Sequence, residues 1–289
     1  MPSEEMLQSE SWSRWVEWGA GRLEFLTERE GRRECELILE TLFGLSRSEI
    51  YFNKIASPRG FFRFSEVVQA RKKRIPLAYL LGRAPFWDEE LEIRSGVFIP
   101  RPETEFLVES FIKMGGFRTH SPFKFLDLGT GSGNIAVTVA KLFPWAEGVG
   151  SDLSGEALET ASHNANHLKV ASRIQWIQAP GLDAFSSRSF DVIFSNPPYI
   201  ASGQCDELEE EVRREPRLAL DGGKDGMKFY RHLLENISTL QLGGSLWIEI
   251  GWDQGERVTA LFENKFERVQ LFQDLEGKDR IVGGTGFHG

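Results

Sequence analysis

The sequence predicts an α/β protein with a largely parallel sheet, preceded by a small domain made of helices. From Phe123 onward, short apolar segments rich in β-favouring residues alternate with helical patterns, and crossover helices of this kind join parallel strands. One of these segments, Phe190–Ser195, is apolar without alternation, as in a strand buried on both faces. Residues 11–83, by contrast, show mainly helical spacing.

Length and composition set the broad class of the protein. A chain of 289 residues is long enough for one large α/β domain and a smaller one. Its 40% hydrophobic content is that of an ordinary soluble globular protein, and no run of 18 apolar residues occurs. The segment Met1–Glu10 is polar and acidic, unlike a secretion signal. We therefore expect a cytoplasmic protein without a membrane partner.

Cysteine usage and charge exclude other classes. Cys35 and Cys205 form no C-x-x-C pair, so neither a disulfide framework nor a zinc site is expected. The formal net charge is −9, with 14 Lys and Arg against 12 Asp and Glu in residues 1–84, and 20 against 31 in residues 85–289. The larger, acidic part repels a phosphate backbone, which argues against a duplex substrate unless a local basic patch offsets the charge.

The N-terminal part, residues 1–84, is expected to be a helical domain. Glu34–Phe43 carries a broad apolar face and ends at Gly44, a typical C-cap. Ser46 and Glu49 have capping-box spacing and open another short helix. A further helix ends in the basic run 71–74, which predicts a solvated face, with a patch for an acidic or phosphate-rich partner as the alternative.

The remainder, residues 85–289, begins with a linker. Pro85–Trp87 and Leu91–Ile93 flank an acidic turn and predict a β-hairpin, which joins the two domains. A proline-locked loop over Phe98–Pro102 then leads into a helix over Glu105–Met114.

The catalytic domain follows as alternating strands and helices. The expected elements are a strand over Phe123–Leu128, a helix over Asn134–Phe143, a strand over Glu147–Ser151, a helix over Ser154–Leu168, a strand over Arg173–Gln178, the buried strand Phe190–Ser195, an amphipathic segment Gly226–Leu240, a strand over Gly244–Gly251, a helix over Gly255–Asn264, and closing strands over Glu267–Asp274 and Lys278–Gly283.

A glycine-rich loop, DLGTGSG, stands at the carboxyl end of the first strand and leads into a helix. Its glycines, Gly129, Gly131 and Gly133, let the main chain turn sharply and approach a ligand. Asp152 ends the next strand, where a carboxylate can bind both hydroxyls of a ribose. The spacing is G-x-G-x-G and not the dinucleotide pattern G-x-G-x-x-G, so the sequence predicts a nucleoside pocket.

The strand Phe190–Ser195 runs into Asn196-Pro197-Pro198-Tyr199, which predicts a rigid acceptor platform. The prolines lack N–H groups and fix the backbone, which leaves carbonyls unpaired. The Asn196 side-chain carbonyl and the Pro197 main-chain carbonyl can together accept both hydrogens of one –NH2 group, and Tyr199 offers an aromatic wall. The ligand that suits this arrangement is a planar –NH2 carrier, either an amide or an exocyclic amine. A plain turn that closes the strand is the alternative.

These residues resemble class I S-adenosylmethionine-dependent methyltransferases and, more narrowly, the release factor glutamine methyltransferase (PrmC/HemK) family. The resemblance covers nearly the whole chain. The matching segments are Pro76-Leu77-Ala78-Tyr79 with Leu81-Gly82, Gly96–Glu105 (GVFIPRPETE), DLGTGSG, SNPPY, Glu215-Pro216 with Ala219-Leu220, and Gly243-Gly244. The segment GVFIPRPETE discriminates best, because DLGTGSG and NPPY also occur in nucleic-acid amino-methyltransferases.

The resemblance implies a Rossmann-like domain with a mostly parallel seven-stranded sheet and a helical N-terminal domain that recognises the substrate. By the same resemblance, Asp152 binds the ribose of S-adenosylmethionine, and Asn196, Pro197, Pro198 and Tyr199 hold the substrate glutamine, with Asn196 also near the cofactor. The product is S-adenosylhomocysteine. The expected cofactor-binding loop comprises Gly129, Thr130, Gly131, Ser132 and Gly133.

The third-strand corner departs from the family pattern. Pro180 and Gly181 stand where an acidic and a bulky residue are common, so we expect Gly181 to contribute main-chain contacts to the adenine.

The implied reaction is methylation of the glutamine side-chain amide, at N5, in the Gly-Gly-Gln motif of class 1 peptide chain release factors. The alternatives are a glutamine of a ribosomal protein, the exocyclic amine of adenine or cytosine in RNA or DNA, which requires base flipping and a basic groove, and a non-enzymatic nucleotide-binding module. His163 and His167 have metal-ligand spacing without a third ligand, so we expect no metal site. The acidic run Asp206–Glu211 is expected to be solvated or to form a docking surface.

Overall fold

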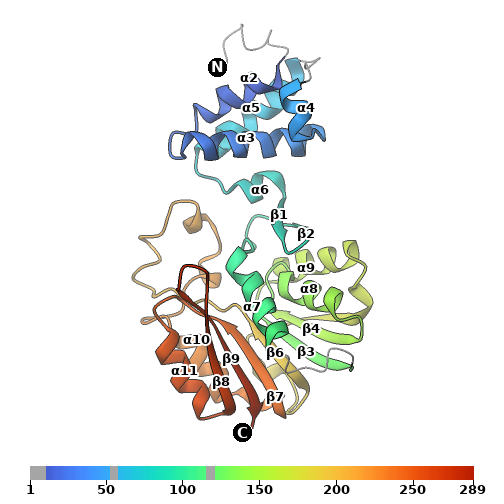
Figure 1. Ribbon diagram of the computed structural model, residues 1–289, viewed down its shortest axis with the longest axis vertical. Helices are drawn as coiled ribbons and strands as arrows, with labels where there is room; N and C mark the ends of the chain where they lie inside the picture. The colour runs from blue at the N-terminus through green and yellow to red at the C-terminus, as the bar shows by residue number, and fades with distance from the viewer. Residues whose placement is uncertain (1–10, 53–57, 115–120) are drawn as a thin grey trace. The chain divides into compact units, whose positions relative to one another are not determined.

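The computed structural model describes residues 11–52, 58–114 and 121–289, and their contacts divide into two compact units (Figure 1). The first unit comprises the residues up to Gly82 together with Glu210–Arg214, and the second comprises Arg83–Glu209 and Glu215–Gly289. The boundary after Gly82 lies next to the division expected after residue 84. The grouping of Glu210–Arg214 with the N-terminal unit was not predicted. Met1–Glu10, whose polar and acidic sequence is unlike a secretion signal, lies outside the described residues.

The first unit is helical in its described residues. Its elements are α2 (Trp12–Ala20), α3 (Glu28–Phe43), α4 (Arg47–Phe52), α5 (Pro58–Lys72) and α6 (Leu77–Leu81). An aromatic core lies between α2 and α5, where the ring of Trp15 contacts Phe61 edge-on at 5.0 Å between centroids. Two predicted helix boundaries are confirmed: Gly44 adopts the left-handed conformation after α3, and Ser46 and Glu49 form a capping box that opens α4.

The basic run at the end of α5 is not simply a solvated face. Arg71 is only 2% exposed, and its guanidinium donates two hydrogen bonds to Glu34, at 2.6 and 2.9 Å. Glu211 pairs with the same guanidinium at 3.0 Å, and Arg71 also lies over the ring of Phe25. A buried guanidinium requires such partners, which explains why Glu211 belongs to the contacts of this unit.

The second unit opens with the hairpin β1 (Arg83–Phe86) and β2 (Glu89–Glu92), as predicted. The predicted turn of three acidic residues, 88–90, is shorter in the structure. Phe86 pairs with Glu89, so the turn is only Trp87 and Asp88, and Glu89 belongs to a strand. The helix that follows, α7 (Pro102–Lys113), begins three residues earlier than predicted, because proline is favoured in the first turn, where its missing N–H costs nothing.

In the described residues the main sheet has seven strands in the order β5-β4-β3-β6-β7-β9-β8. The first five in this order are parallel, and β9 is antiparallel to both of its neighbours. The predicted mostly parallel seven-stranded sheet is thus confirmed. The strands are β3 (Phe123–Leu128), β4 (Ala146–Asp152), β5 (Ile174–Gln178), β6 (Phe190–Ser195), β7 (Leu240–Glu249), β8 (Phe266–Gln273) and β9 (Asp279–Phe287).

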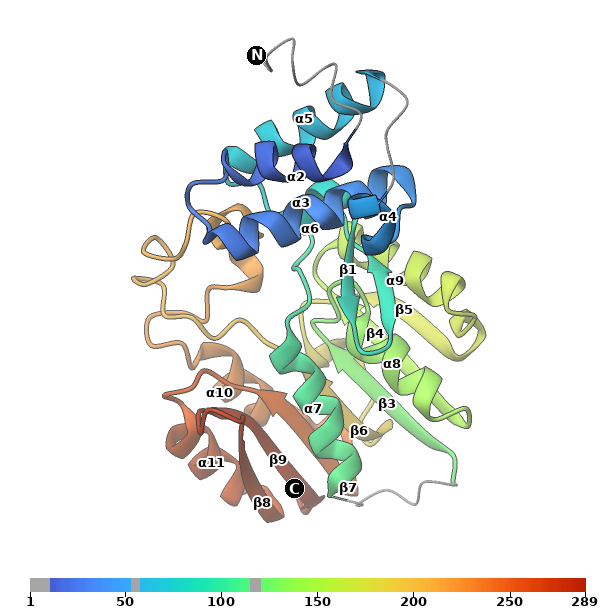
Figure 2. The same ribbon diagram turned by 45° about the horizontal axis from the view of Figure 1, so that its top comes forward.

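Helices pack on both faces of this sheet, and the strands alternate accordingly. On β6, Ile193 joins the core under α10 (Lys228–Glu235) and α11 (Gly255–Glu263), whereas Phe194 contacts Phe111 of α7 at 5.0 Å between ring centroids. Figure 2 shows α7 lying across the sheet. The other helices of the sheet domain are α8 (Asn134–Leu142) and α9 (Gly155–His167), with single 3-10 turns at Ala171–Arg173, Leu182–Ala184, Arg217–Ala219 and Ile237–Thr239. The 3-10 turn Val212–Arg214 belongs to the first unit.

The largest error of the sequence prediction lies between α10 and β7. The amphipathic segment predicted to reach Leu240 is helical only to Glu235, and β7 begins at Leu240 instead of Gly244. A register irregularity against β6 absorbs the extra residues between Leu240 and Ser245. In the described ranges, no helix combines the length and the apolar character needed to cross a membrane.

Candidate active site

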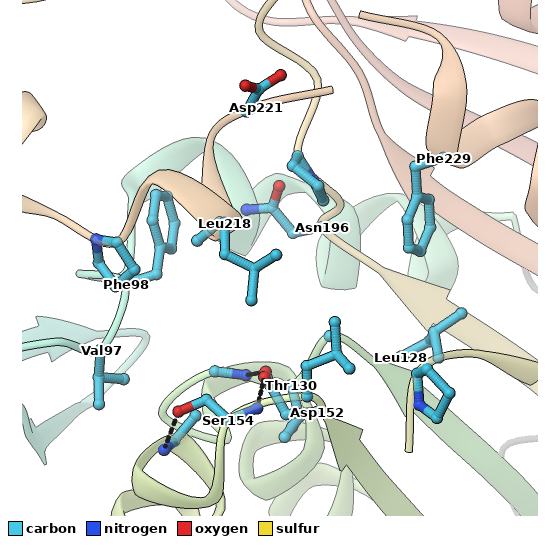
Figure 3. Close-up of a pocket in the computed structure, with 18 of the residues that line it drawn as sticks. Val97, Phe98, Leu128, Thr130, Asp152, Ser154, Asn196, Leu218, Asp221 and Phe229 are labelled. Atoms are coloured by element: carbon cyan, nitrogen blue, oxygen red, sulfur yellow. Dashed lines mark hydrogen bonds between the residues drawn. The ribbon is translucent and has the colours of Figure 1, made fainter. Parts of the chain in front are cut away.

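A cavity of about 440 Å³ lies at the carboxyl ends of β3, β4 and β6, within the second unit (Figure 3). Ligands of open parallel sheets bind at this edge, and the volume suits a small organic ligand. Figure 3 shows Thr130 and Asp152 on one side of the cavity and Asn196 on another. Of the predicted site residues, the following line it: Gly129, Thr130, Gly131, Ser132, Asp152, Asn196 and Pro198. Gly133, Gly181, Pro197 and Tyr199 are not among the described residues that do.

The glycine loop between β3 and α8 presents bare main chain to the cavity. Gly129 and Gly131 have positive φ values of 75° and 55°, which only glycine adopts without strain. A Cβ at either position would meet no atom within 4 Å, so the space beside them is open. Gly133 has a different role, since a Cβ there would lie 2.9 Å from Ala161 of α9. It permits the close approach of α8 and α9.

Asp152 fixes the loop from the end of β4. One carboxylate oxygen accepts a hydrogen bond from the Gly131 N–H at 2.9 Å, and the other accepts from the Ser154 N–H at 2.9 Å. Each oxygen can accept a further hydrogen bond, so the carboxylate can bind two hydroxyl groups while it holds the loop.

Two buried polar groups under the loop lack partners among the described residues. Asp127 is fully buried; its Oδ2 accepts from the Thr130 hydroxyl at 2.6 Å and the Ala136 N–H at 3.1 Å, whereas its Oδ1 accepts no bond. The hydroxyl of Ser132, which lines the cavity, is also unpartnered. The Ser132 hydroxyl is therefore available to a polar ligand beside the loop, whereas Asp127 does not line the cavity.

The buried carboxyl of Asp127 gives a prediction about stability. Burial raises its pKa from 3.8 to about 7, so the folded protein binds this proton more tightly than the unfolded chain does. The resulting stabilisation is complete below about pH 4 and is lost as the pH rises to about 7. We expect Asp127→Asn to reduce the fall in the free energy of unfolding between pH 5 and pH 7 by about 1 kcal/mol per pH unit. Urea unfolding of the ligand-free protein at three pH values tests this, and an unchanged slope would contradict it.

Apolar side chains that the sequence analysis did not assign to the cofactor site form the cavity walls. Leu128 and Phe229 lie on one side, and Val97, Phe98 and Leu218 approach from two loops (Figure 3). Phe229 comes from α10, together with Lys228 and His232. These three residues lie in the amphipathic segment recognised in the sequence, but nothing in its spacing showed that part of it faces a ligand. Flat apolar walls of this kind suit an aromatic base.

A buried ion pair joins the two loops that bear these walls. Glu215 accepts a hydrogen bond from the Ile99 N–H at 3.1 Å and pairs with the guanidinium of Arg101. Its side chain is 2% exposed, and that of Arg101 is 31% exposed. Val97 and Phe98 precede this contact on one loop, and Pro216 follows it on the other.

We expect Glu215→Ala to lower the free energy of unfolding by about 1–3 kcal/mol, because it leaves a buried N–H and a guanidinium without their acceptor. Both loops should also become more sensitive to limited proteolysis. Glu215→Gln can still accept from the Ile99 N–H, so its free energy of unfolding should lie between those of Glu215→Ala and wild type. Glu147→Ala is the control, because it removes an exposed carboxylate at the amino end of β4. If Glu215→Ala and Glu147→Ala were equally stable and equally sensitive to the protease, the Glu215–Arg101 pair would have no role in joining the two loops.

A hydrogen bond from its side-chain amide holds Asn196 in place. Its Nδ2 donates to the hydroxyl of Thr104 at 2.9 Å, and Thr104 donates to Glu249 Oε2 at 2.7 Å. No described residue donates to Asn196 Oδ1 or to the main-chain carbonyl of Pro197. Two acceptors at the end of β6 therefore have no donor among the described residues, and their use by an –NH2 group stays a prediction.

Tyr199 is bound at both ends. Its hydroxyl donates to Glu249 Oε1 at 3.3 Å, and its main-chain carbonyl accepts from Gln254 at 2.9 Å. Burial raises the pKa of this hydroxyl, which stays protonated and remains a donor. Thr104 and Glu249 were not predicted as site residues. The signal that could have indicated Glu249 is a carboxylate within the apolar strand sequence LWIEIG.

The two histidines with metal-ligand spacing lie outside the cavity lining. The imidazole of His163 lies 2.7 Å from a carboxylate oxygen of Glu92. Among the residues that the structure describes, no group of three or more His, Cys, Asp or Glu side chains could hold a metal ion.

Comparison with known families adds to this geometry. The model of the methyltransferase small domain matches residues 102–224, and the model of the PrmC N-terminal domain matches residues 14–82. A protein of Caulobacter vibrioides named release factor glutamine methyltransferase is 40% identical over 257 residues, which cover 87% of this chain and 88% of the relative. The protein of the same name from Bacillus subtilis is 34% identical, with coverage of 92% and 95%.

Among solved structures, the catalytic domain of human Mettl16 in complex with an RNA hairpin is similar, with a TM-score of 0.55. The two chains share 12% sequence identity, over 79% of this chain and 82% of the other. At this identity the similarity concerns the fold alone.

Proposed function

The chain belongs to the release factor glutamine methyltransferase family, and from this we propose that it methylates the side-chain amide nitrogen, N5, of the glutamine in the Gly-Gly-Gln motif of a class 1 peptide chain release factor. S-adenosylmethionine is the methyl donor. The observation that supports this best is the pair of acceptors at Asn196 and Pro197, to which no described residue donates, beside the cavity that Asn196 lines.

The cavity fits S-adenosylmethionine by four of its features. Asp152 can accept from both ribose hydroxyls, and the open space beside Gly129 and Gly131 admits the ligand close to the main chain. The unpartnered hydroxyl of Ser132 suits the polar methionine portion. Leu128 and Phe229 offer apolar faces to the adenine. Gly181, expected from the sequence to contact the adenine, is not among the described residues that line the cavity, although its neighbour Pro180 is.

The donor, when bound, supplies an electrophilic methyl group on a sulfonium sulfur. The task of the protein is to present a nitrogen whose lone pair is delocalised into a carbonyl. Asn196 Oδ1 and the Pro197 carbonyl accept the two hydrogens of the glutamine –NH2 group, which aims the nitrogen and raises its electron density. The nitrogen then forms its bond to the methyl carbon while the bond from that carbon to the sulfur breaks, which leaves S-adenosylhomocysteine. It releases one proton to solvent as or after the new bond forms. In this scheme Pro198 keeps the main chain rigid.

The remaining assignments concern the partner. We propose that residues 1–84 recognise the release factor, and that the enzyme acts in the cytoplasm, where translation ends. The acidic balance of residues 85–289 favours a protein substrate over a nucleic acid.

Transfer of labelled methyl from S-adenosylmethionine tests this function. The substrates are a purified class 1 release factor, the same factor with the loop glutamine replaced, a preparation of ribosomal proteins, and ribosomal RNA. Label on the intact factor alone is the expected result. Label on the ribosomal proteins or on the RNA alone would overturn the proposal, because the –NH2 group would then belong to another glutamine or to a base.

A further inference from the structure

We propose that Glu249, acting through the hydroxyl of Thr104, determines which end of the Asn196 amide faces the substrate. This inference rests on the function proposed above, and it makes Thr104 and Glu249 positioning residues. They lie on different elements, Thr104 in the first turn of α7 and Glu249 at the end of β7, and both are buried.

The Thr104 hydroxyl has a single hydrogen to donate. A carboxylate can only accept, so the Thr104 hydroxyl must donate to Glu249 Oε2 across their 2.7 Å contact. Because that hydrogen is used in the bond to Glu249, the Thr104 hydroxyl can only accept in its other contact, with the Asn196 side chain at 2.9 Å. The group of Asn196 that meets Thr104 is therefore its –NH2, and Oδ1 is left for the substrate.

The direction of the two hydrogen bonds of the Thr104 hydroxyl depends on the charge of Glu249. A protonated Glu249 can donate to Thr104, whose hydrogen is then free to point at Asn196. The amide would rotate to meet it with Oδ1, and its –NH2 would face the substrate –NH2 group. Two donors facing each other make no hydrogen bond, so the acceptor required for methyl transfer would be lost.

The same carboxylate holds both ends of the Asn196–Tyr199 segment. While Oε2 accepts from Thr104, Oε1 accepts from the Tyr199 hydroxyl at 3.3 Å. One ionised side chain thus supports the orientation of Asn196 and the position of Tyr199.

The surroundings of Glu249 place its titration in an observable range. Burial raises its pKa from 4.5 to about 7, and Glu103 of α7 acts in the same direction. Thr104, Tyr199 and Arg280 of β9 oppose the rise, and the hydroxyl of Tyr230 on α10 bonds the Glu249 main-chain carbonyl. Activity should therefore decline as the pH falls below about 7.

The first experiment measures kcat for methylation of the intact release factor. Thr104→Val should lower kcat by about 10- to 100-fold, the usual effect of a misplaced reacting group, with the affinity for S-adenosylmethionine unchanged. Thr104→Ser keeps the hydroxyl and should recover most of the rate. Thr239→Val is the matched control, since this buried threonine lies just before the opposite end of β7 and has no described partner for its hydroxyl. A Thr104→Val rate within twofold of wild type would overturn the proposal.

Two further readouts separate positioning from a general structural effect. In an Asn196→Ala background, Thr104→Val should lower kcat no further, because it acts only through Asn196. If the two substitutions together lowered kcat by the product of their separate factors, the inference would be refuted. Glu249→Gln, which cannot titrate, should abolish the acidic limb of the pH–rate profile. Persistence of that limb in a folded Glu249→Gln protein would also count against it.

A spectroscopic experiment does not depend on the identity of the substrate. In protein labelled with 15N-asparagine, the side-chain amide signal of Asn196, assigned with Asn196→Asp, should shift in Thr104→Val and remain near its wild-type position in Thr104→Ser. If wild type methylates no release factor, the proposed function fails, and this signal still decides the coupling. An unmoved Asn196 signal in Thr104→Val would reject it.

Discussion

Replacing Asn196 with alanine lowers kcat for methylation of the release factor by about 10²–10³-fold, the range observed when one preorganised hydrogen-bonding group is removed from an active site. The reason is specific to this structure. Asn196 Oδ1 has no donor among the described residues, and its amide is held by Thr104, so the acceptor is already in place before the substrate arrives. The rate is measured under saturating S-adenosylmethionine and release factor, so that chemistry and not binding is compared.

The matched control for this variant is Asn166→Ala. Asn166 is exposed on α9, and its side chain has one hydrogen-bond partner among the described residues, the Ser162 carbonyl of its own helix. It should keep the wild-type rate and thereby show that loss of an asparagine as such is harmless. Full activity of Asn196→Ala would mean that the substrate nitrogen is positioned by other groups, and the acceptor pair would lose its role.

Replacing Asp152 with alanine weakens binding of S-adenosylmethionine by about 10- to 100-fold. This corresponds to the 1.5–3 kcal/mol of a typical hydrogen bond to a charged group. Two losses combine here: the acceptors for the ribose hydroxyls disappear, and the N–H groups of Gly131 and Ser154 lose the carboxylate that fixes the glycine loop. Calorimetric titration with the cofactor measures the change directly.

Glu147→Ala controls for the charge. It lies on the same strand, β4, at the amino end, and is exposed. The variant removes one negative charge without touching the cavity, so its affinity should match that of wild type. If both variants weakened binding equally, the effect of Asp152 would be general electrostatics and not a built contact.

Much of this site could be predicted from local sequence because its main parts are short segments at strand ends. The apolar run Phe190–Ser195 marks a central strand, and parallel topology then brings its end beside those of β3 and β4. Asn196, Asp152 and the glycine loop could be brought together on that basis alone.

The contacts that orient these residues could not be predicted in this way. Thr104 and Glu249 are 145 residues apart in sequence, and no periodicity connects them. Thr104 lies within a segment that the resemblance singled out, but a threonine after a proline-rich loop predicts a helix start as readily as a hydrogen bond to asparagine. Similarly, Gly133 shares the loop pattern with Gly131, yet only the packing of α8 on α9 distinguishes its role.

The position of β9 has a consequence for biosynthesis. This strand is the last in chain order, yet it lies between β7 and β8 and pairs with both. During translation β7 and β8 are therefore made first and have open edges until residues 279–287 leave the ribosome, and open edges pair readily with other chains. Because Ile281 of β9 pairs with Glu249, the strand that carries Glu249 gains this neighbour only once β9 is available. We therefore expect a nascent chain that ends before residue 279 to lack activity and to be prone to aggregation.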